Sequence, residues 1–235
     1  MAAPQYVAVA GGAAIVTTAA TSNVPLYRCS TNGCGNSPRI LTTGPSPANV
    51  VADVNHAVWI QGTTDLRSCP NVDAACTPAT LASAASGGDF TSALAIADGI
   101  VYFASSSTIF RVPADGSAPA TPLVSGLAGV SALASDGVDV YYAESGFIGR
   151  CPVAGCAATS PVAVPATFVR RVEVDTTHVY WMTQAGAASS VMACPKSGCA
   201  TIDEQHTYLV DRVFDFAVDG TNVYWANGAV RFVHK

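Results

Sequence analysis

The chain has 235 residues, of which 50% are hydrophobic and only 11% are charged, and its formal net charge is −5. This composition excludes an intrinsically disordered chain and argues against nucleic acid as a partner, because binding to phosphates needs concentrated Lys and Arg. No apolar run reaches the roughly 20 residues of a membrane-spanning helix without Gly, Thr or polar interruption, so we expect no transmembrane segment.

One pattern recurs six times along the chain. It opens with a short run rich in Ala and Val, and an Asp usually starts the turn that follows. A run rich in Val, Tyr and Trp comes next, then a Gly/Ser/Thr-rich turn, a third run, a short loop and a fourth apolar run. Aromatic residues of the second run recur at spacings of about 40 residues: Trp59, Phe103, Tyr142, Trp181 and Trp225.

Four short strands in about 40–45 residues predict one blade of a β-propeller. We therefore predict an all-β, six-bladed β-propeller of four-stranded antiparallel blades, in which the last blade has three strands. A five-bladed propeller with an extra terminal segment is the alternative, and the short last repeat also fits a piece of a longer protein. We expect one domain over residues 1–235, with approximate repeats at 5–47, 48–89, 90–128, 129–167, 168–211 and 212–235.

The eight cysteines form four local pairs, each of which brackets the loop between a third and a fourth strand. A disulfide that closes such a hairpin is sterically reasonable, because cross-strand Cα distances suit it. The third repeat has the cysteine-free VPADGS (112–117) at this place, so the position requires only a tight turn. The predicted disulfide cysteines are Cys29 and Cys34, Cys69 and Cys76, Cys151 and Cys156, and Cys194 and Cys199.

Two chemical alternatives for these cysteines fit less well. A zinc site needs four converging ligands, and a redox site prefers C-x-x-C at the start of a helix. We therefore predict no metal site and no cofactor. An even number of cysteines in local pairs is typical of an oxidising compartment, so we expect an extracytoplasmic protein that is secreted, periplasmic or surface-anchored.

The repeated D-x-x-x-V-Y-W and C-P-x-x-G-C elements resemble the propeller repeats of secreted or surface-anchored bacterial proteins, which are broadly similar to NHL and YWTD propellers. The resemblance covers nearly the whole chain, and its motifs specify blade structure more than function. The first repeat departs from it by lacking the turn Asp and the aromatic doublet. The third departs by lacking the cysteines.

The aromatic residues and the turn aspartates each have two interpretations. Trp59, Trp181 and Trp225 could line ligand pockets between blades, as in lectin-like propellers, although such rings more often form the core between blades. An Asp at the start of a turn most often accepts hydrogen bonds from its own backbone. We expect the Arg that recurs on the third strands to pair with an acidic turn of a neighbouring blade.

The few charges on the first strands offer the one candidate polar site. Arg171 and Glu173 alternate onto one face of a strand, and Asp215 aligns with Arg171 on the next blade. The cluster is either a partly solvated structural ion pair or a small pocket near the propeller axis for an anionic or hydroxylated ligand. No G-x-S-x-G, H-E-x-x-H, P-loop or Rossmann motif occurs in the sequence.

These observations leave two functions open, because propellers host many unrelated activities. The first is a non-enzymatic binding or scaffold module, which presents loops or a polar channel end to a protein or glycan partner. The second is a lyase or hydrolase that uses Glu173, Arg171 and Asp215. The sequence favours the first, and it predicts neither a particular ligand nor an oligomeric state.

Overall fold

The computed structural model describes residues 4–18, 23–32, 38–45, 47–83, 90–105, 107–156, 160–185, 188–201, 206–211, 215–226 and 230–235. Within these ranges every regular element is a β-strand. No helix in the described part of the chain is long and apolar enough to cross a membrane. The chain forms two compact units, residues 1–122 and 123–235, and the boundary falls within a strand.

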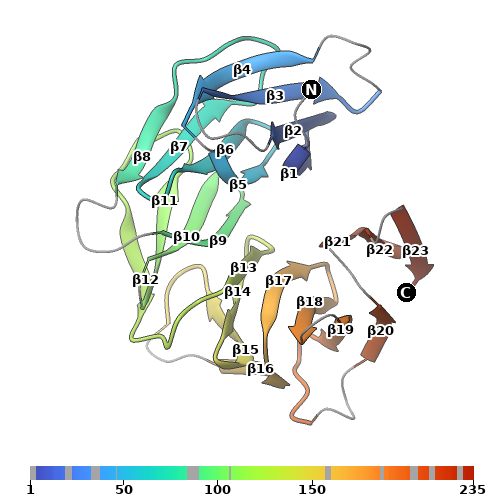
Figure 1. Ribbon diagram of the computed structural model, residues 1–235. Coiled ribbons are helices and arrows are strands. Elements are labelled where there is room, and N and C mark those ends of the chain that lie inside the picture. The colour runs from blue at the N-terminus through green and yellow to red at the C-terminus, as the bar shows by residue number, and fades with distance from the viewer. Residues whose placement is uncertain are drawn as a thin grey trace. The chain divides into compact units, whose positions relative to one another are not determined.

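The first unit carries three antiparallel sheets, in which each strand lies beside its neighbour in the sequence (Figure 1). Blade one consists of β1 (Pro4–Ala10), β2 (Ala13–Thr18), β3 (Val24–Ser30) and β4 (Arg39–Gly44). Blade two consists of β5 (Pro47–Ala52), β6 (His56–Gln61), β7 (Asp65–Pro70) and β8 (Ala79–Ser83). Blade three consists of β9 (Phe90–Ala97), β10 (Ile100–Ser105), β11 (Thr108–Pro113) and β12 (Thr121–Ser125), the strand that contains the boundary.

The second unit continues the same order through three more sheets. Blade four consists of β13 (Ala132–Ser135), β14 (Asp139–Glu144), β15 (Gly146–Pro152) and β16 (Ser160–Ala166). Blade five consists of β17 (Val169–Val174), β18 (His178–Ala185), β19 (Ala188–Pro195) and β20 (His206–Asp211). Blade six has three strands, β21 (Asp215–Val218), β22 (Asn222–Ala226) and β23 (Val230–His234).

This arrangement confirms the predicted six blades, with a three-stranded last blade. The five-bladed alternative is wrong, because β21, β22 and β23 pair with one another as a separate sheet. Within each unit the first strands of successive blades lie next to one another: β1, β5 and β9 in the first unit, and β13, β17 and β21 in the second. Whether the chain behaves as a single domain stays a prediction.

The second strand is buried on both faces in blades two to five, which explains its composition. Four consecutive residues are buried in β6, β10, β14 and β18, whereas β2 and β22 are only partly buried. A strand covered on both faces is typically rich in β-branched and aromatic residues, which fill the space between sheets. Burying one such large side chain contributes roughly 1.5–3 kcal/mol, so this strand forms the core of its blade.

The turn between the first and second strands is held by its Asp, as expected. One carboxylate oxygen of Asp175 accepts hydrogen bonds from the amides of Thr177 and His178, at 2.7 and 2.8 Å. Asp53, Asp136 and Asp219 bind the equivalent pair of amides in their own turns. Blade three differs, because Asp98 and Gly99 both have positive φ angles, 50° and 74°, in a two-residue hairpin.

The loops after the third strands of blades three, four and five share one turn, with or without cysteines. The amide of Gly155 donates to the carbonyl of Pro152, and that of Gly198 donates to Pro195. In the cysteine-free loop Gly116 donates to Pro113 in the same way, which confirms that VPADGS forms the expected tight turn. Among the described residues three disulfides are seen, with Cα–Cα distances of 6.1, 5.5 and 6.0 Å for Cys69–Cys76, Cys151–Cys156 and Cys194–Cys199. The predicted fourth pair includes Cys34, which lies outside the described residues.

Candidate functional site

The charges predicted as a site form one small ionic cluster on β17 and β21. Nη2 of Arg171 lies 2.6 Å from Oε1 of Glu173, and its Nε lies 3.3 Å from Oδ1 of Asp215 on the neighbouring blade. The side chains are 37%, 28% and 50% exposed, in that order. One guanidinium thus bridges two carboxylates.

Burial and the charge of Asp215 raise the pKa of Glu173 above its usual value, and Arg171 opposes them. Because Arg171 is committed to both carboxylates, the cluster has the geometry of an inter-blade ion pair. The feature of this cluster that could serve catalysis is the raised pKa of the Glu173 carboxyl. Its role as a site stays a prediction.

The three tryptophans lie in or against the packed core. Trp59 and Trp181 are 2% and 0% exposed, so their rings are closed off from solvent. Trp225 is half-buried and packs against the apolar cluster of blades five and six, which contains Phe216. Its indole Nε1 is buried without a hydrogen-bond partner in the described structure. This burial favours the core interpretation, and the ligand-binding role stays a prediction.

The Arg that recurs on the third strands contacts the following blade in blades one and four. In blade two it contacts its own blade instead. Nε of Arg28 on blade one donates to Oδ1 of Asn71 on blade two, at 3.0 Å, and its Nη1 lies 3.9 Å from Asp73. Nη1 of Arg150 donates to the backbone carbonyl of Lys196 on blade five. Arg67 instead forms an ion pair with Asp65 on its own strand.

A second set of contacts between blades comes from the residue just after the third strand in blades two, five and six. Asn71, Lys196 and Lys235, here called the tie residues, each donate their amide to the turn carbonyl of their own blade. Their side chains then reach the preceding blade. Nζ of Lys196 lies 2.6 Å from Oδ2 of Asp136, and Nδ2 of Asn71 donates to the carbonyl of Ala10.

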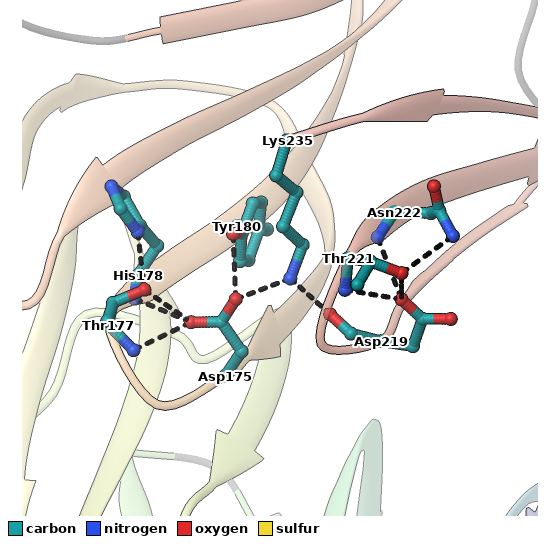
Figure 2. Close-up of polar contacts among 8 residues, drawn as sticks. All are labelled: Asp175, Thr177, His178, Tyr180, Asp219, Thr221, Asn222 and Lys235. Carbon is teal, nitrogen blue, oxygen red and sulfur yellow. Dashed lines mark hydrogen bonds and ion pairs between the residues drawn. The ribbon is translucent and has the colours of Figure 1, made fainter.

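Lys235 makes the most elaborate of these ties (Figure 2). Its Nζ donates to Oδ2 of Asp175 on blade five and to the backbone carbonyl of Asp219 on blade six. The same Nζ lies 4.7 Å from the centre of the Tyr180 ring, and the Tyr180 hydroxyl donates to Asp175. Both ion-pair side chains are about 15% exposed. The tie therefore fixes the turn of blade five against the end of β23.

The electrostatics of this tie show in the pKa of Asp175. Burial alone would raise the pKa, but hydrogen bonds from Lys235, from the amides of Thr177 and His178 and from Tyr180 outweigh it. The pKa of Asp175 therefore lies well below its usual range. Burial and the neighbouring carboxylate raise the pKa of Tyr180, so its hydroxyl stays protonated and acts as a donor.

Beside this tie lies a groove with a volume of about 630 Å³, here called the Tyr208 groove. It is bordered by the polar turn of blade five, by the tie residue of blade six and by the outer strand β20. The lining residues include Asp175, His178, Tyr180, His206, Tyr208 and Lys235. All of them belong to the second compact unit.

Four rings follow one another along the groove. Ring centroids are 6.0 Å apart for His178 and Tyr180, 5.9 Å for Tyr180 and Tyr208, and 4.4 Å for Tyr208 and His206. The small Ala193 on β19 pairs with both Tyr180 and His206, which gives the rings of β18 and β20 room to meet. His206 is exposed and Tyr208 is half-buried, so the outer end of the row faces solvent.

Sequence reasoning missed this groove. Lys196 and Lys235 occupy the same position after their third strands, and that recurrence was the available signal. Their acidic partners lie on the preceding repeat, about 60 residues earlier in both cases, so the ion pairs emerge only from packing.

The charged groups of the Tyr208 groove are already paired with one another. Its Lys and Asp neutralise each other, and its Tyr hydroxyl is committed to Asp175. No group of three His, Cys, Asp or Glu able to hold a metal ion occurs among the described residues. What it offers a partner is a row of rings with polar edges.

No known family model and no curated protein matches this sequence. Solved structures do match it. The WD40 domain of Toxoplasma gondii coronin aligns with a TM-score of 0.70 at 10% identity, over 97% of this chain and 66% of that one. A chain of a nidogen/laminin complex aligns with a TM-score of 0.66 at 13% identity, over 88% and 79%. A putative TolB from Agrobacterium tumefaciens aligns with a TM-score of 0.64 at 13% identity, over 89% and 80%.

At these identities the likeness shows the fold alone. The chain is an all-β, six-bladed β-propeller, which confirms that part of the predicted resemblance. The narrower likeness to secreted bacterial NHL-type repeats stays a prediction.

Proposed function

We propose that this protein is a non-enzymatic, extracytoplasmic binding module whose Tyr208 groove takes a protein partner. The row of four rings at the groove carries the proposal. Tyr is enriched at the centre of protein–protein interfaces, where a rigid ring gives a large contact area at low entropic cost. A groove of this size, with charges already paired at its rim, suits a docked polypeptide segment.

The comparisons support the proposal only through the fold. In the nidogen/laminin structure a chain of similar fold occurs together with another protein, which makes protein binding a known use of the architecture. The proposed location rests on the three disulfides, because such bonds persist in oxidising compartments. A glycan is the alternative partner for the same binding module.

Selection of peptides from a displayed library tests the proposal. We expect peptides that bind the wild-type protein and lose roughly tenfold or more in affinity for Tyr208→Ala or His206→Ala, the loss typical of a central interface residue. Phe168→Ala is the matched control, because Phe168 is an aromatic residue with 69% exposure outside the groove.

Two outcomes would contradict the proposal. Selected peptides that bind both groove variants as tightly as the wild type place the binding surface elsewhere. Binding on a glycan array that disappears in Tyr208→Ala, without any peptide binding, assigns the groove to carbohydrate.

The second candidate is a lyase or hydrolase at Arg171, Glu173 and Asp215. The raised pKa of Glu173 favours it, because a carboxyl group with a raised pKa is better suited to exchange a proton with a substrate. Glu173→Gln should then abolish any hydrolytic or eliminating activity that the protein shows. An activity unchanged by this substitution excludes the site, and Asp65→Asn tests an ion-paired carboxylate away from it.

A further inference from the structure

Blade one places two arginines opposite each other on neighbouring strands. Arg28 on β3 pairs in register with Arg39, the first residue of β4. Side chains of such a pair lie on the same face of the sheet, with their Cβ atoms about 5 Å apart, so that two like charges there destabilise the pairing. Natural proteins keep local conflicts of this kind mainly where a function requires them.

The position opposite the recurring Arg carries a hydroxyl residue in blades two and four. The Arg of the third strand faces Thr80 in blade two and Ser160 in blade four. In blade two, Nη1 of Arg67 donates to the Thr80 hydroxyl, and its Nη2 lies 2.7 Å from Oδ2 of Asp65. Blade one therefore has a positive charge at a place where the repeat needs only a small polar side chain.

The negative charge beside these arginines comes from the cysteine loop of blade two. Cys69 and Cys76 have a sequence separation of 7, against 5 for the disulfides of blades four and five, so this loop is the longer one. Oδ1 of Asp73 lies 3.9 Å from Nη1 of Arg28 and 3.7 Å from Nε of Arg39. Both distances are too long for hydrogen bonds, and the Asp73 side chain is 72% exposed. One carboxylate oxygen thus lies within reach of two guanidiniums and is held only loosely.

The two arginines differ in how firmly they are held. The side chain of Arg28 is 16% exposed, and its Nε donates to Oδ1 of Asn71 at 3.0 Å. Nδ2 of Asn71 in turn donates to the carbonyls of Asp53 and Ala10. The side chain of Arg39 is 50% exposed. A fixed guanidinium beside a more accessible one suits an oxyanion, because the planar donors of Arg match a carboxylate in geometry and charge.

We propose that Arg28 and Arg39, here called the arginine pair, bind a carboxylate from an acidic segment of a partner protein, which displaces Asp73. The group that lies beside both arginines is itself a carboxylate, and this indicates the chemistry of the ligand. Val72, the neighbour of Asp73 in the loop, is 48% exposed and offers the segment an apolar contact. The arginine pair belongs to the first compact unit, so this second binding surface is independent of the Tyr208 groove.

A tetra-glutamate peptide with acetylated and amidated ends serves as the probe, and the tetra-glutamine peptide is its neutral control. In ¹⁵N-labelled protein we expect the acidic peptide to shift the side-chain Nε–Hε resonances of Arg28 and Arg39 in a saturable way. The neutral peptide should leave both resonances in place. Added salt should weaken the binding, because it screens charges that are accessible to solvent.

Three substitutions, followed at the Arg28 resonance, separate a ligand site from a purely structural ion pair. Asp73→Asn should tighten the binding roughly two- to fivefold, because it removes a carboxylate that competes for both arginines. Arg39→Ala should weaken it roughly tenfold or more, the loss expected when a charge-assisted hydrogen bond is removed. Arg231→Ala is the matched control and should leave it unchanged, because Arg231 is exposed and has the same register on β23 as Arg67 on β7.

The inference is overturned if the acidic peptide binds neither the wild type nor Asp73→Asn, or if Asp73→Asn does not tighten the binding. Equal weakening by Arg39→Ala and Arg231→Ala also overturns it, because the peptide would then respond only to positive charge in general. Inorganic sulfate that shifts the arginine resonances as strongly as the peptide, at equal ionic strength, assigns the pair to small oxyanions instead of a protein. All these outcomes leave the proposed function of the Tyr208 groove to its own test.

Discussion

At the scale of single residues, the turn aspartates organise many of the polar contacts. Asp175 and Asp219 each accept two amide hydrogen bonds and one from a tyrosine hydroxyl, Tyr180 or Tyr224. These bonds favour the charged form, so that the pKa of both carboxyls lies well below the usual range. Hydrogen bonds from Lys196 and two amides likewise overcome burial and lower the pKa of Asp136.

These lowered pKa values predict acid sensitivity. A carboxyl group whose pKa is lower in the folded chain stabilises it above the unfolded value, and the contribution is lost as the pH falls through the folded value. The free energy of unfolding should therefore decrease between about pH 5 and pH 1. Urea unfolding at a series of pH values should show a flatter dependence for Asp175→Asn.

Asp73→Asn is the control for this experiment, since that carboxylate is 72% exposed and its two Arg contacts are no shorter than 3.7 Å. A pH dependence that is equally steep in Asp175→Asn and the wild type would contradict the assignment.

Single residues also show which contacts could be predicted from the sequence. The Asp turn was predicted because its acceptor and donors lie within three residues of each other. The bonds of Lys196 and Lys235 were not predicted, because each side chain contacts a turn in another repeat. Arg171 and Asp215 were paired by alignment of two first strands, which is a longer-range inference that the repeat made possible.

At the scale of elements, the cysteine loop is both a staple and a contact between blades. Cys194 and Cys199 are 0% and 6% exposed and belong to one apolar cluster with Val162 and Trp181. The loop thus closes its own hairpin, and the amide of Cys199 donates to the carbonyl of Val162 on β16 of the preceding blade, at 2.7 Å. The first role was predicted from spacing, whereas the second depends on which strand lies opposite, which spacing within a repeat does not report.

Removal of this disulfide tests both roles. Cys194→Ala with Cys199→Ala should lower the free energy of unfolding by about 2 kcal/mol or more, because a small-loop disulfide is lost together with buried side chains. Hydrogen exchange at the β16 amides should also become faster. A stability loss without faster exchange in β16 would show that the loop staples blade five alone.

At the scale of the whole molecule, the fold was the most predictable feature. Each blade is made from neighbouring strands in sequence order, so that local alternation and turns specify it. Because the pattern occurs in six repeats, the departures of the first repeat do not obscure it. The Tyr208 groove was not predictable in this way, because it arises where the contacts of two successive repeats differ.

The oxidising location can be tested on the intact protein. We expect material from its natural source to have no cysteine that reacts with an alkylating reagent before reduction, and all eight to react afterwards. Mass spectrometry of the alkylated chain gives the count. Alkylation of native Cys151 or Cys194 before reduction would contradict an oxidising compartment.

The tie residues have a consequence for the order of the blades. Asn71 engages Arg28 and a carbonyl of blade one, whereas Lys196 and Lys235 each engage the turn carboxylate of the blade before them. Blades with the same fold therefore contact their neighbours through different side chains. If repeats two and five were exchanged by permuting the gene, Lys196 would follow a first repeat that lacks the turn Asp, and Asn71 would face the carboxylate of Asp136. Such a shuffled chain would keep its pattern of strands and lose these side-chain contacts between neighbouring blades.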